Sequence, residues 1–265
     1  ETECVYAGSL VVDLYGTYTN IQAAVNVAQD GNKIYITADQ TFTGTGNFNI
    51  EITKNLTFDR IGTGANPIID LNYQGRLFGI YPDCTVTMNN LEVKNGYVVG
   101  SVGGAILAEG NLNATDCTFI GNTATGFGGA LAVAGLNVTG CTFIGNSSTN
   151  YSGGAIYAGN GIVSCSRFAG NTAPVGSAVT AEITVTATNN WWGTNSPSSS
   201  LFSGNVIYDP YIIMSIDSTH PGSGPAIVTV SFTKNGSCTI PDTIITFTST
   251  DGIVTPTQTL VVDGI

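Results

Sequence analysis

The sequence predicts an all-β protein: a right-handed parallel β-helix with a short N-terminal capping helix, followed by a partial immunoglobulin-like β-sandwich. The main observation is an internal repeat, because residues 113–135 (NATDCTFIGNTATGFGGALAVAG) and 137–159 (NVTGCTFIGNSSTNYSGGAIYAG) are near copies. The spacing of Cys117 and Cys141 sets a period of about 24 residues, which suits one turn with three short strands and three corners. The repeat is rich in Thr, Val, Ile, Asn and Gly and lacks a helical pattern, which also indicates a β-solenoid.

Two other repeat folds fit this sequence less well. A leucine-rich repeat has a similar length but needs a ladder of leucines, which the sequence lacks. A propeller blade needs about 40 residues or more. In a parallel β-helix, equivalent residues of successive turns stack about 4.8 Å apart, so each repeated residue becomes one member of a column.

The repeat predicts three such columns. Aromatic rings should stack inside the helix, and the cysteines two residues earlier should face the same way because side chains alternate along a strand. Asparagines should occupy a corner, where they tolerate a left-handed backbone better than most residues. The expected columns are Phe119, Phe143 and Phe168; Cys117, Cys141 and Cys165; and Asn95, Asn122, Asn146 and Asn171.

Residues 1–32 are expected to form an N-terminal segment and the capping helix. Ile21, Ala24 and Val25 recur at the spacing of one helical face, and an open solenoid needs its terminal strand edges covered. The β-helix is expected to follow over residues 33–205.

The far end of the chain is expected to close with tryptophans and then change fold. Trp191 and Trp192 suit an end cap of bulky rings, and an aromatic platform for sugars is the alternative. Residues 206–265 carry alternating Thr, Val and Ile runs typical of an immunoglobulin-like module, but that fold needs about 100 residues. The incomplete module is completed either by further chain or by a strand from another copy. Residues 9–15 are the expected donor strand, and head-to-tail donation would build a filament.

The charge composition argues against some partners. Charged residues make up 9% of the chain, the net charge is −11 and the pI is near 4.1, so binding to nucleic acid is not expected. No apolar run reaches the roughly 18 residues of a membrane span. No signal peptide begins at Glu1, so we expect a mature, exported chain. Sequons support export and are candidate glycosylation sites: Asn55, Asn113, Asn137, Asn146, Asn150 and Asn235.

The cysteines are even in number, as in many exported proteins with disulfides. Those of the repeat are expected to be buried as small hydrophobic residues, because three stacked residues cannot all pair. Cys4 and Cys238 lie outside the repeat and are the expected disulfide.

Parallel β-helices also include polysaccharide lyases and hydrolases, so the carboxylates have to be considered as catalysts. Hydrolysis needs two carboxyl groups about 5 to 9.5 Å apart, and a calcium-assisted lyase needs an acidic cluster with a basic residue. Asp70 near Arg76 is the nearest approach, and an ion pair or corner cap explains it equally well. Asp116 has no acidic partner in the neighbouring turns, and His220 lies in a turn sequence typical of a linker. The sequence therefore predicts no catalytic residue, no cofactor and no metal site.

Three features occur together in this chain: turns that carry GGA[IL] and FxxN, the exit NNWWGTN, and the later segment PDTIITFTSTDGIVTPTQ. In this combination the chain resembles adhesin-like proteins of methanogenic archaea over essentially its whole length. GGA[IL] and FxxN also recur in bacterial polymorphic outer-membrane proteins, and the C-terminal part resembles invasin/intimin-type modules.

The resemblance implies an extracellular, cell-surface protein that mediates attachment or forms a surface assembly. The expected partners are cell-wall or neighbouring-cell surface components, either glycan or protein. The alternative functions are a carbohydrate-active lyase or hydrolase and a glycan-binding module. An aromatic-rich, solvent-facing cleft would favour glycan binding, and clustered carboxylates would favour an enzyme.

Overall fold

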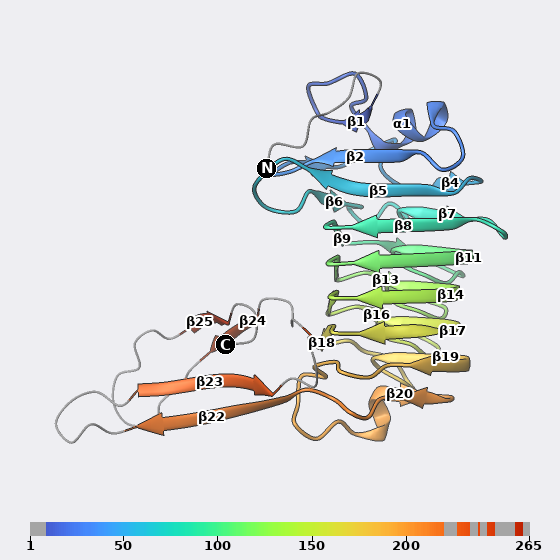
Figure 1. Ribbon diagram of the computed structural model, residues 1–265. Helices are drawn as coiled ribbons and strands as arrows, with labels where there is room; N and C mark the ends of the chain where they lie inside the picture. Colours follow the sequence, from blue (N-terminus) through green and yellow to red (C-terminus); the bar gives the residue numbers. More distant parts are fainter. Residues whose placement is uncertain (1–8, 220–226, 234–237, 239–242, 247–257, 262–265) are drawn as a thin grey trace.

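The computed structural model describes residues 9–219, 227–233, 238, 243–246 and 258–261. Most of the described chain forms one parallel β-solenoid of about eight turns (Figure 1). Its strands stack along the solenoid axis, so that β1 lies at one end and β20 at the other.

Three parallel sheets form the sides of the solenoid. The longest contains β1 (Leu10–Val12), β2 (Lys33–Thr37), β4 (Ile50–Ile52), β5 (Leu56–Ile61), β7 (Phe78–Ile80), β8 (Thr85–Asn89), β11 (Ile106–Thr115), β14 (Leu131–Thr139), β17 (Ile156–Ser164), β19 (Val179–Thr186), β20 (Phe202–Ser203) and β21 (Val206–Ile207). The second contains β3 (Thr41–Phe42), β6 (Ile68–Asp70), β9 (Glu92–Lys94), β12 (Thr118–Ile120), β15 (Thr142–Ile144) and β18 (Arg167–Ala169). The third contains β10 (Tyr97–Val98), β13 (Thr123–Ala124) and β16 (Ser147–Ser148).

Alternation along the strands places the core inside the solenoid. In β2, for example, Ile34 and Ile36 are buried while the residues on either side are partly exposed, as expected for a strand with one covered face. Register is kept from turn to turn, because Phe119 pairs with Val93 on one side and with Phe143 on the other. One continuous hydrophobic core therefore runs along the axis.

A short helix, α1 (Ile21–Val27), lies near the β1 end of the solenoid (Figure 1). The Asn20 side chain caps its N-terminus by accepting a hydrogen bond from Ala23 N at 2.9 Å. At the other end, Lys54 Nζ donates to the Val25 and Ala28 carbonyls at 2.9 and 2.6 Å. The positive charge of this ammonium stabilises the helix C-terminus, where the helix dipole is negative. The helix is thus fixed to a later turn, and its role as a cap remains a prediction.

The expected boundaries of the β-helix are too narrow at both ends. β1 pairs in parallel with β2, so the solenoid sheet begins at Leu10 rather than at Lys33. β21 pairs with β19, so the sheet extends past residue 205. Residues 10–12, expected to be donated to another copy, are instead paired within their own chain.

The C-terminal residues that the structure describes form two antiparallel pairs. β22 (Ile213–Thr219) pairs with β23 (Ile227–Thr233), and β24 (Thr243–Thr246) pairs with β25 (Gln258–Val261). An immunoglobulin-like sandwich is not established by these strands and remains a prediction. His220 lies outside the described residues.

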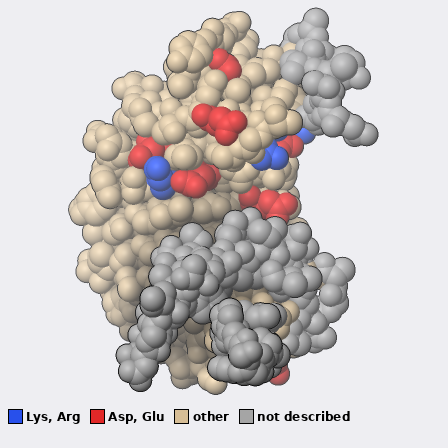
Figure 2. Space-filling model, turned by 90° about the vertical axis from the view of Figure 1, so that its left-hand side faces the viewer, with Lys and Arg blue, Asp and Glu red and all other residues tan. Residues whose placement is uncertain are grey.

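Charged residues are unevenly distributed. On the face shown in Figure 2, the visible Asp, Glu, Lys and Arg side chains gather mainly over the N-terminal turns. Residues 117–166 contain no charged residue at all. No helix in the described part of the chain is long and apolar enough to cross a membrane.

Candidate functional site

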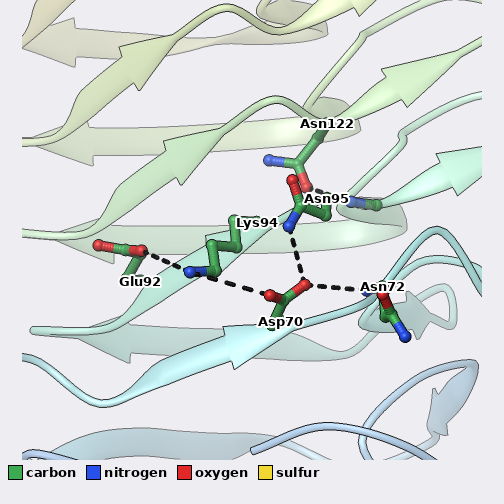
Figure 3. Close-up of polar contacts among 7 residues, drawn as sticks. Asp70, Asn72, Glu92, Lys94, Asn95 and Asn122 are labelled. Carbon is green, nitrogen blue, oxygen red and sulfur yellow. Dashed lines mark hydrogen bonds and ion pairs between the residues drawn. The ribbon is translucent and has the colours of Figure 1, made fainter. Parts of the chain in front are cut away.

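The candidate carboxylate, Asp70, ends strand β6 and lies in a polar cluster with residues of the next turn (Figure 3). Its Oδ1 accepts hydrogen bonds from Asn95 Nδ2 at 2.9 Å and from Asn72 N at 3.0 Å. Lys94 Nζ lies 3.8 Å from its Oδ2, because Asp70 and Lys94 are paired neighbours on β6 and β9. Asp70 therefore joins two turns and fixes the corner that follows β6.

Glu92 shares the same lysine, with its Oε1 3.9 Å from Lys94 Nζ (Figure 3). Partial burial raises the pKa of Glu92, the Lys94 ammonium opposes this rise, and the Asp70 carboxylate adds to it. A raised carboxyl pKa is what a general acid requires. Here, however, one ammonium bridges both carboxylates, and this arrangement stabilises the contact between β6 and β9.

Arg76 is not part of this cluster, so the expected Asp70–Arg76 pairing is wrong. Arg76 Nη2 donates to Ser101 Oγ at 2.6 Å. Burial lowers the pKa of the Arg76 guanidinium, and the Glu51 carboxylate opposes that shift. Arg76 therefore belongs to a different corner of the solenoid.

Asp116 is exposed and has a left-handed backbone, with φ of 52°. The register places it in a row with Asn90, Gly140, Cys165 and Asn189, all of which have positive φ. Asp, Asn and Gly are the residue types that adopt this conformation at least cost. Desolvation by the neighbouring turns raises the pKa of the Asp116 carboxyl. Its conformation makes Asp116 a corner residue of the same kind as its neighbours.

The interior aromatic column runs along the solenoid axis. Phe119 and Phe143 have ring centroids 5.1 Å apart and nearly parallel planes, and Phe143 and Phe168 are 4.9 Å apart. Trp192 continues the stack 4.6 Å from Phe168 and meets Phe202 edge-on. These rings fill the centre of the core at the C-terminal end.

Trp191 and Trp192 are both buried, at 6% and 3% exposure. Trp191 packs edge-on against Phe232 in a small second cluster with Ile212. Burial excludes the alternative in which these rings form an exposed platform for sugars.

The corner asparagines form a hydrogen-bonded ladder inside the solenoid. Asn122 Nδ2 donates to Asn146 Oδ1 at 3.0 Å, and Asn146 Nδ2 donates to Asn171 Oδ1 at 3.0 Å. Each of these oxygens also accepts a backbone N–H of the preceding turn, and each amide group also donates to a backbone carbonyl there. The ladder satisfies backbone groups that the corner would otherwise leave unpaired.

Asn95 does not belong to this ladder, which corrects the expected column. The register aligns Asn95 with Gly121, and Gly96 takes the position of Asn122. Asn95 and Gly121 share a left-handed backbone, with φ of 57° and 61°. Asn95 uses its side chain to bind Asp70 instead.

Cys117 and Cys141 are buried and free, as expected for small hydrophobic core residues. Burial raises the pKa of the Cys141 thiol, which favours its protonated form. Cys165 does not continue their column, because the next turn has one extra residue and Ser166 takes that position. The expected three-cysteine column is therefore wrong at its third member.

Cys165 forms a disulfide with Cys238 across a sequence separation of 73. The expected Cys4–Cys238 pairing is thus wrong, and Cys4 lies outside the described residues. Shifted to the corner row, Cys165 is only partly buried and can meet a cysteine from outside the solenoid. The bond ties the C-terminal part to the side of the solenoid.

The sequons differ in accessibility. Asn146 is fully buried and its amide is bonded within the ladder, so its expected glycosylation is excluded in the folded protein. Asn55, Asn137 and Asn150 are exposed, Asn113 is partly buried, and Asn235 lies outside the described residues.

Two features were missed from the sequence. Asn190 is buried and repeats the ladder chemistry one turn later, because its Oδ1 accepts Ser166 N and its Nδ2 donates to the Val163 carbonyl at 2.8 Å. The sequence signal for this residue is the NNWWG exit, and the register places Asn190 after Ser166 in the column of Cys117 and Cys141. The second feature is an outward aromatic cluster around Phe127, whose members are not adjacent in sequence.

One family model matches part of the chain: the Chlamydia polymorphic membrane protein repeat, over residues 116–134 and 140–159. The two matches fall on successive turns of the solenoid, which stack in register along β12 and β15 and along β13 and β16. No curated protein and no solved structure matches the chain. The match supports a repeat of the type found in surface proteins and leaves the archaeal resemblance a prediction.

Proposed function

We propose that this protein is an extracellular, cell-surface structural or adhesive protein whose solenoid holds a binding surface away from the cell. The observation that carries the proposal is the pair of polymorphic membrane protein repeats, stacked as two consecutive turns. Interior columns of rings and amides join these turns, which suits a stiff rod. Such a rod would attach its cell to a glycan or protein of a cell wall or of a neighbouring cell.

The test uses intact cells that produce the protein. Antibodies against it should label these cells without permeabilisation, and beads coated with the purified protein should attach to cell-wall material more than beads coated with an unrelated protein. Labelling that requires permeabilisation would overturn the proposed location. Attachment no better than that of the control beads would overturn an adhesive role.

A carbohydrate-active enzyme is the competing function, favoured by the raised pKa of Glu92 beside Asp70. The bridging lysine argues against it, because both carboxylates already have a structural partner. We expect no reducing sugar or unsaturated product from a panel of plant, host and wall polysaccharides, with or without calcium. Turnover that Asp70→Asn or Glu92→Gln abolishes would establish the enzyme instead.

Self-association into filaments is a further part of the proposal. Because β1 is paired with β2, donation of this strand to another copy would require it first to leave its own sheet. Deletion of residues 1–15 and sedimentation at increasing concentration would test this route. Donation predicts that the shortened chain stays monomeric under conditions in which the full chain assembles.

A further inference from the structure

One outward row of the solenoid carries both a hollow and a cluster of aromatic side chains. Strand pairing places Gly79 next to Leu107, Leu107 next to Ala132, and Ala132 next to Tyr157. These three steps of about 4.8 Å give a row of about 14 Å along the axis. The hollow lies at the Gly79 end and the aromatic cluster at the Tyr157 end.

The hollow has a volume of about 260 Å³, and both apolar and acidic side chains line it. It exists at this place because Gly79 has no side chain, and a Cβ there would come 2.7 Å from Glu51 Oε2. Glu51, Tyr81 and Glu109 are exposed at its sides. The hollow is lined by Glu51, Gly79, Ile80, Tyr81, Leu107 and Glu109.

The aromatic cluster is centred on Phe127. Its ring centroid lies 4.7 Å from that of Tyr151 and 4.6 Å from that of Tyr157. Tyr151 is 53% exposed, and the other two rings are partly exposed. Burial raises the pKa of the Tyr157 phenol, and the exposed Glu182 carboxylate raises it further.

The surrounding surface limits the class of ligand. Residues 117–166 contain no charged residue, so the middle of the row has no cation to attract an anionic polymer. Glu51 and Glu109 at one end and Glu182 at the other accept hydrogen bonds from hydroxyl groups and repel anions. Aromatic rings offer an apolar face to a ligand that also has polar groups. Carboxylates and rings spread along one row suit an extended, uncharged, polyhydroxylated chain.

We propose that this row, from the hollow at Gly79 to the Phe127–Tyr151–Tyr157 cluster, binds a neutral polysaccharide chain along the solenoid axis. The proposal rests on the proposed surface function and names the class of partner for it. The C–H faces of the sugar rings pack on Tyr151 and Tyr157, and sugar hydroxyls donate to Glu109 and Glu182.

The test is electrophoresis of the purified full chain in native gels that contain a soluble polysaccharide. The neutral polymers are hydroxyethyl cellulose, mannan and galactan, and polygalacturonate serves as the acidic one. At least one neutral polymer should slow the protein, and polygalacturonate should not. The double variant Tyr151→Ala/Tyr157→Ala should bind at least about tenfold more weakly, the loss expected for two stacked rings.

Tyr73→Ala is the matched control, because Tyr73 is 61% exposed and lies outside the row. This variant should bind like the unchanged protein, and circular dichroism should show the same fold for all variants. The proposal is overturned if none of the three neutral polymers slows the protein, or if Tyr73→Ala loses as much binding as the double variant. It is also overturned if the protein self-associates through this row, shown by sedimentation that the double variant alone changes. The antibody-labelling result does not depend on any of these outcomes. Failure of the polysaccharide proposal can therefore be distinguished from failure of the proposed surface function.

Discussion

In the early turns of the solenoid and in the turns of residues 117–166, different chemistry joins one turn to the next. In the early turns, charged side chains bridge neighbouring turns: Lys33 Nζ lies 2.8 Å from Asp59 Oδ2, and Asp39 Oδ1 accepts Ala65 N at 2.8 Å. In the uncharged turns, buried amides and glycines perform the same task. The same sheets thus continue through turns that are joined in two different ways.

Turn length explains the difference. Phe119 and Phe143 are in register and occupy the same place in two repeats of equal length, so identical corners stack and one amide can bond to the next. Leu56 and Val86 are also in register, but the turn between them is longer, so its corners cannot match those of the next turn. Where successive corners do not match, charged side chains that reach from one turn to the next join the turns instead. Equal turn length therefore permits a buried ladder, whereas unequal length leaves partly exposed ion pairs that contribute less.

The largest expected effect comes from charging the aromatic column of the regular turns. Phe143→Asp should prevent folding, because it buries an unpaired carboxylate between Phe119 and Phe168. Ile162→Asp adds the same charge at a position that is 52% exposed and should fold normally. Circular dichroism and soluble yield would measure both. A folded Phe143→Asp protein would show that the column is not essential to the regular turns.

Removing one amide of the asparagine ladder should cause the next largest loss of stability. Asn146→Ala leaves the Phe119 carbonyl and the Asn122 N–H without their partners, at a cost of about 2 to 4 kcal/mol in the free energy of unfolding. Asn137→Ala changes an exposed asparagine of the same repeat and should stay within about 0.5 kcal/mol. Chemical denaturation would measure both values. Equal stability of the two variants would mean that the ladder does not distinguish the regular turns.

The repeat could be predicted where it was regular, and errors arose where its length changed. The aromatic column follows from two turns of nearly equal length, whose aligned phenylalanines the sequence displays directly. Asn95 was misplaced because the corner requires a left-handed backbone, a property that Asn and Gly share. Cys165 was misplaced because one added residue moved Ser166 into the column.

The functional features were harder to predict for a related reason. The Cys165–Cys238 bond joins the solenoid to a part of the chain with no repeat, so periodicity carries no information about it. The outward row depends on which residues of four different turns lie side by side, and Gly79, Tyr157 and Glu182 come from dissimilar local sequences. The sequence suggests Arg76 as the neighbour of Asp70, whereas register places Lys94 beside it.

The disulfide should affect the C-terminal part more than either kind of turn. Cys238→Ser should loosen the attachment of β22 and β23 while leaving the solenoid folded, with a local loss of about 2 to 4 kcal/mol. Limited proteolysis should then remove the C-terminal part faster and leave a resistant solenoid. Cys84→Ser, which changes a free cysteine, is the control and should keep the original cleavage rate. Unchanged proteolysis of Cys238→Ser would contradict the role of the bond.

The smallest effect is expected at Glu92, in the irregular turns. Its pKa in the folded protein is raised above the ordinary 4.5, so the folded state holds its proton more tightly than the unfolded state. The free energy of unfolding therefore falls as pH rises from the unfolded pKa through the folded pKa, by less than about 1 kcal/mol because the group is partly exposed. Glu92→Gln should flatten this part of the stability profile, measured by denaturation between pH 4 and neutral pH.

Asp116→Asn is the comparison, because Asp116 also has a raised pKa but no ion-pair partner among the described residues. If Glu92→Gln instead steepens the fall, the attraction between Glu92 and Lys94 outweighs burial, and the ion pairs of the irregular turns contribute more than their exposure indicates.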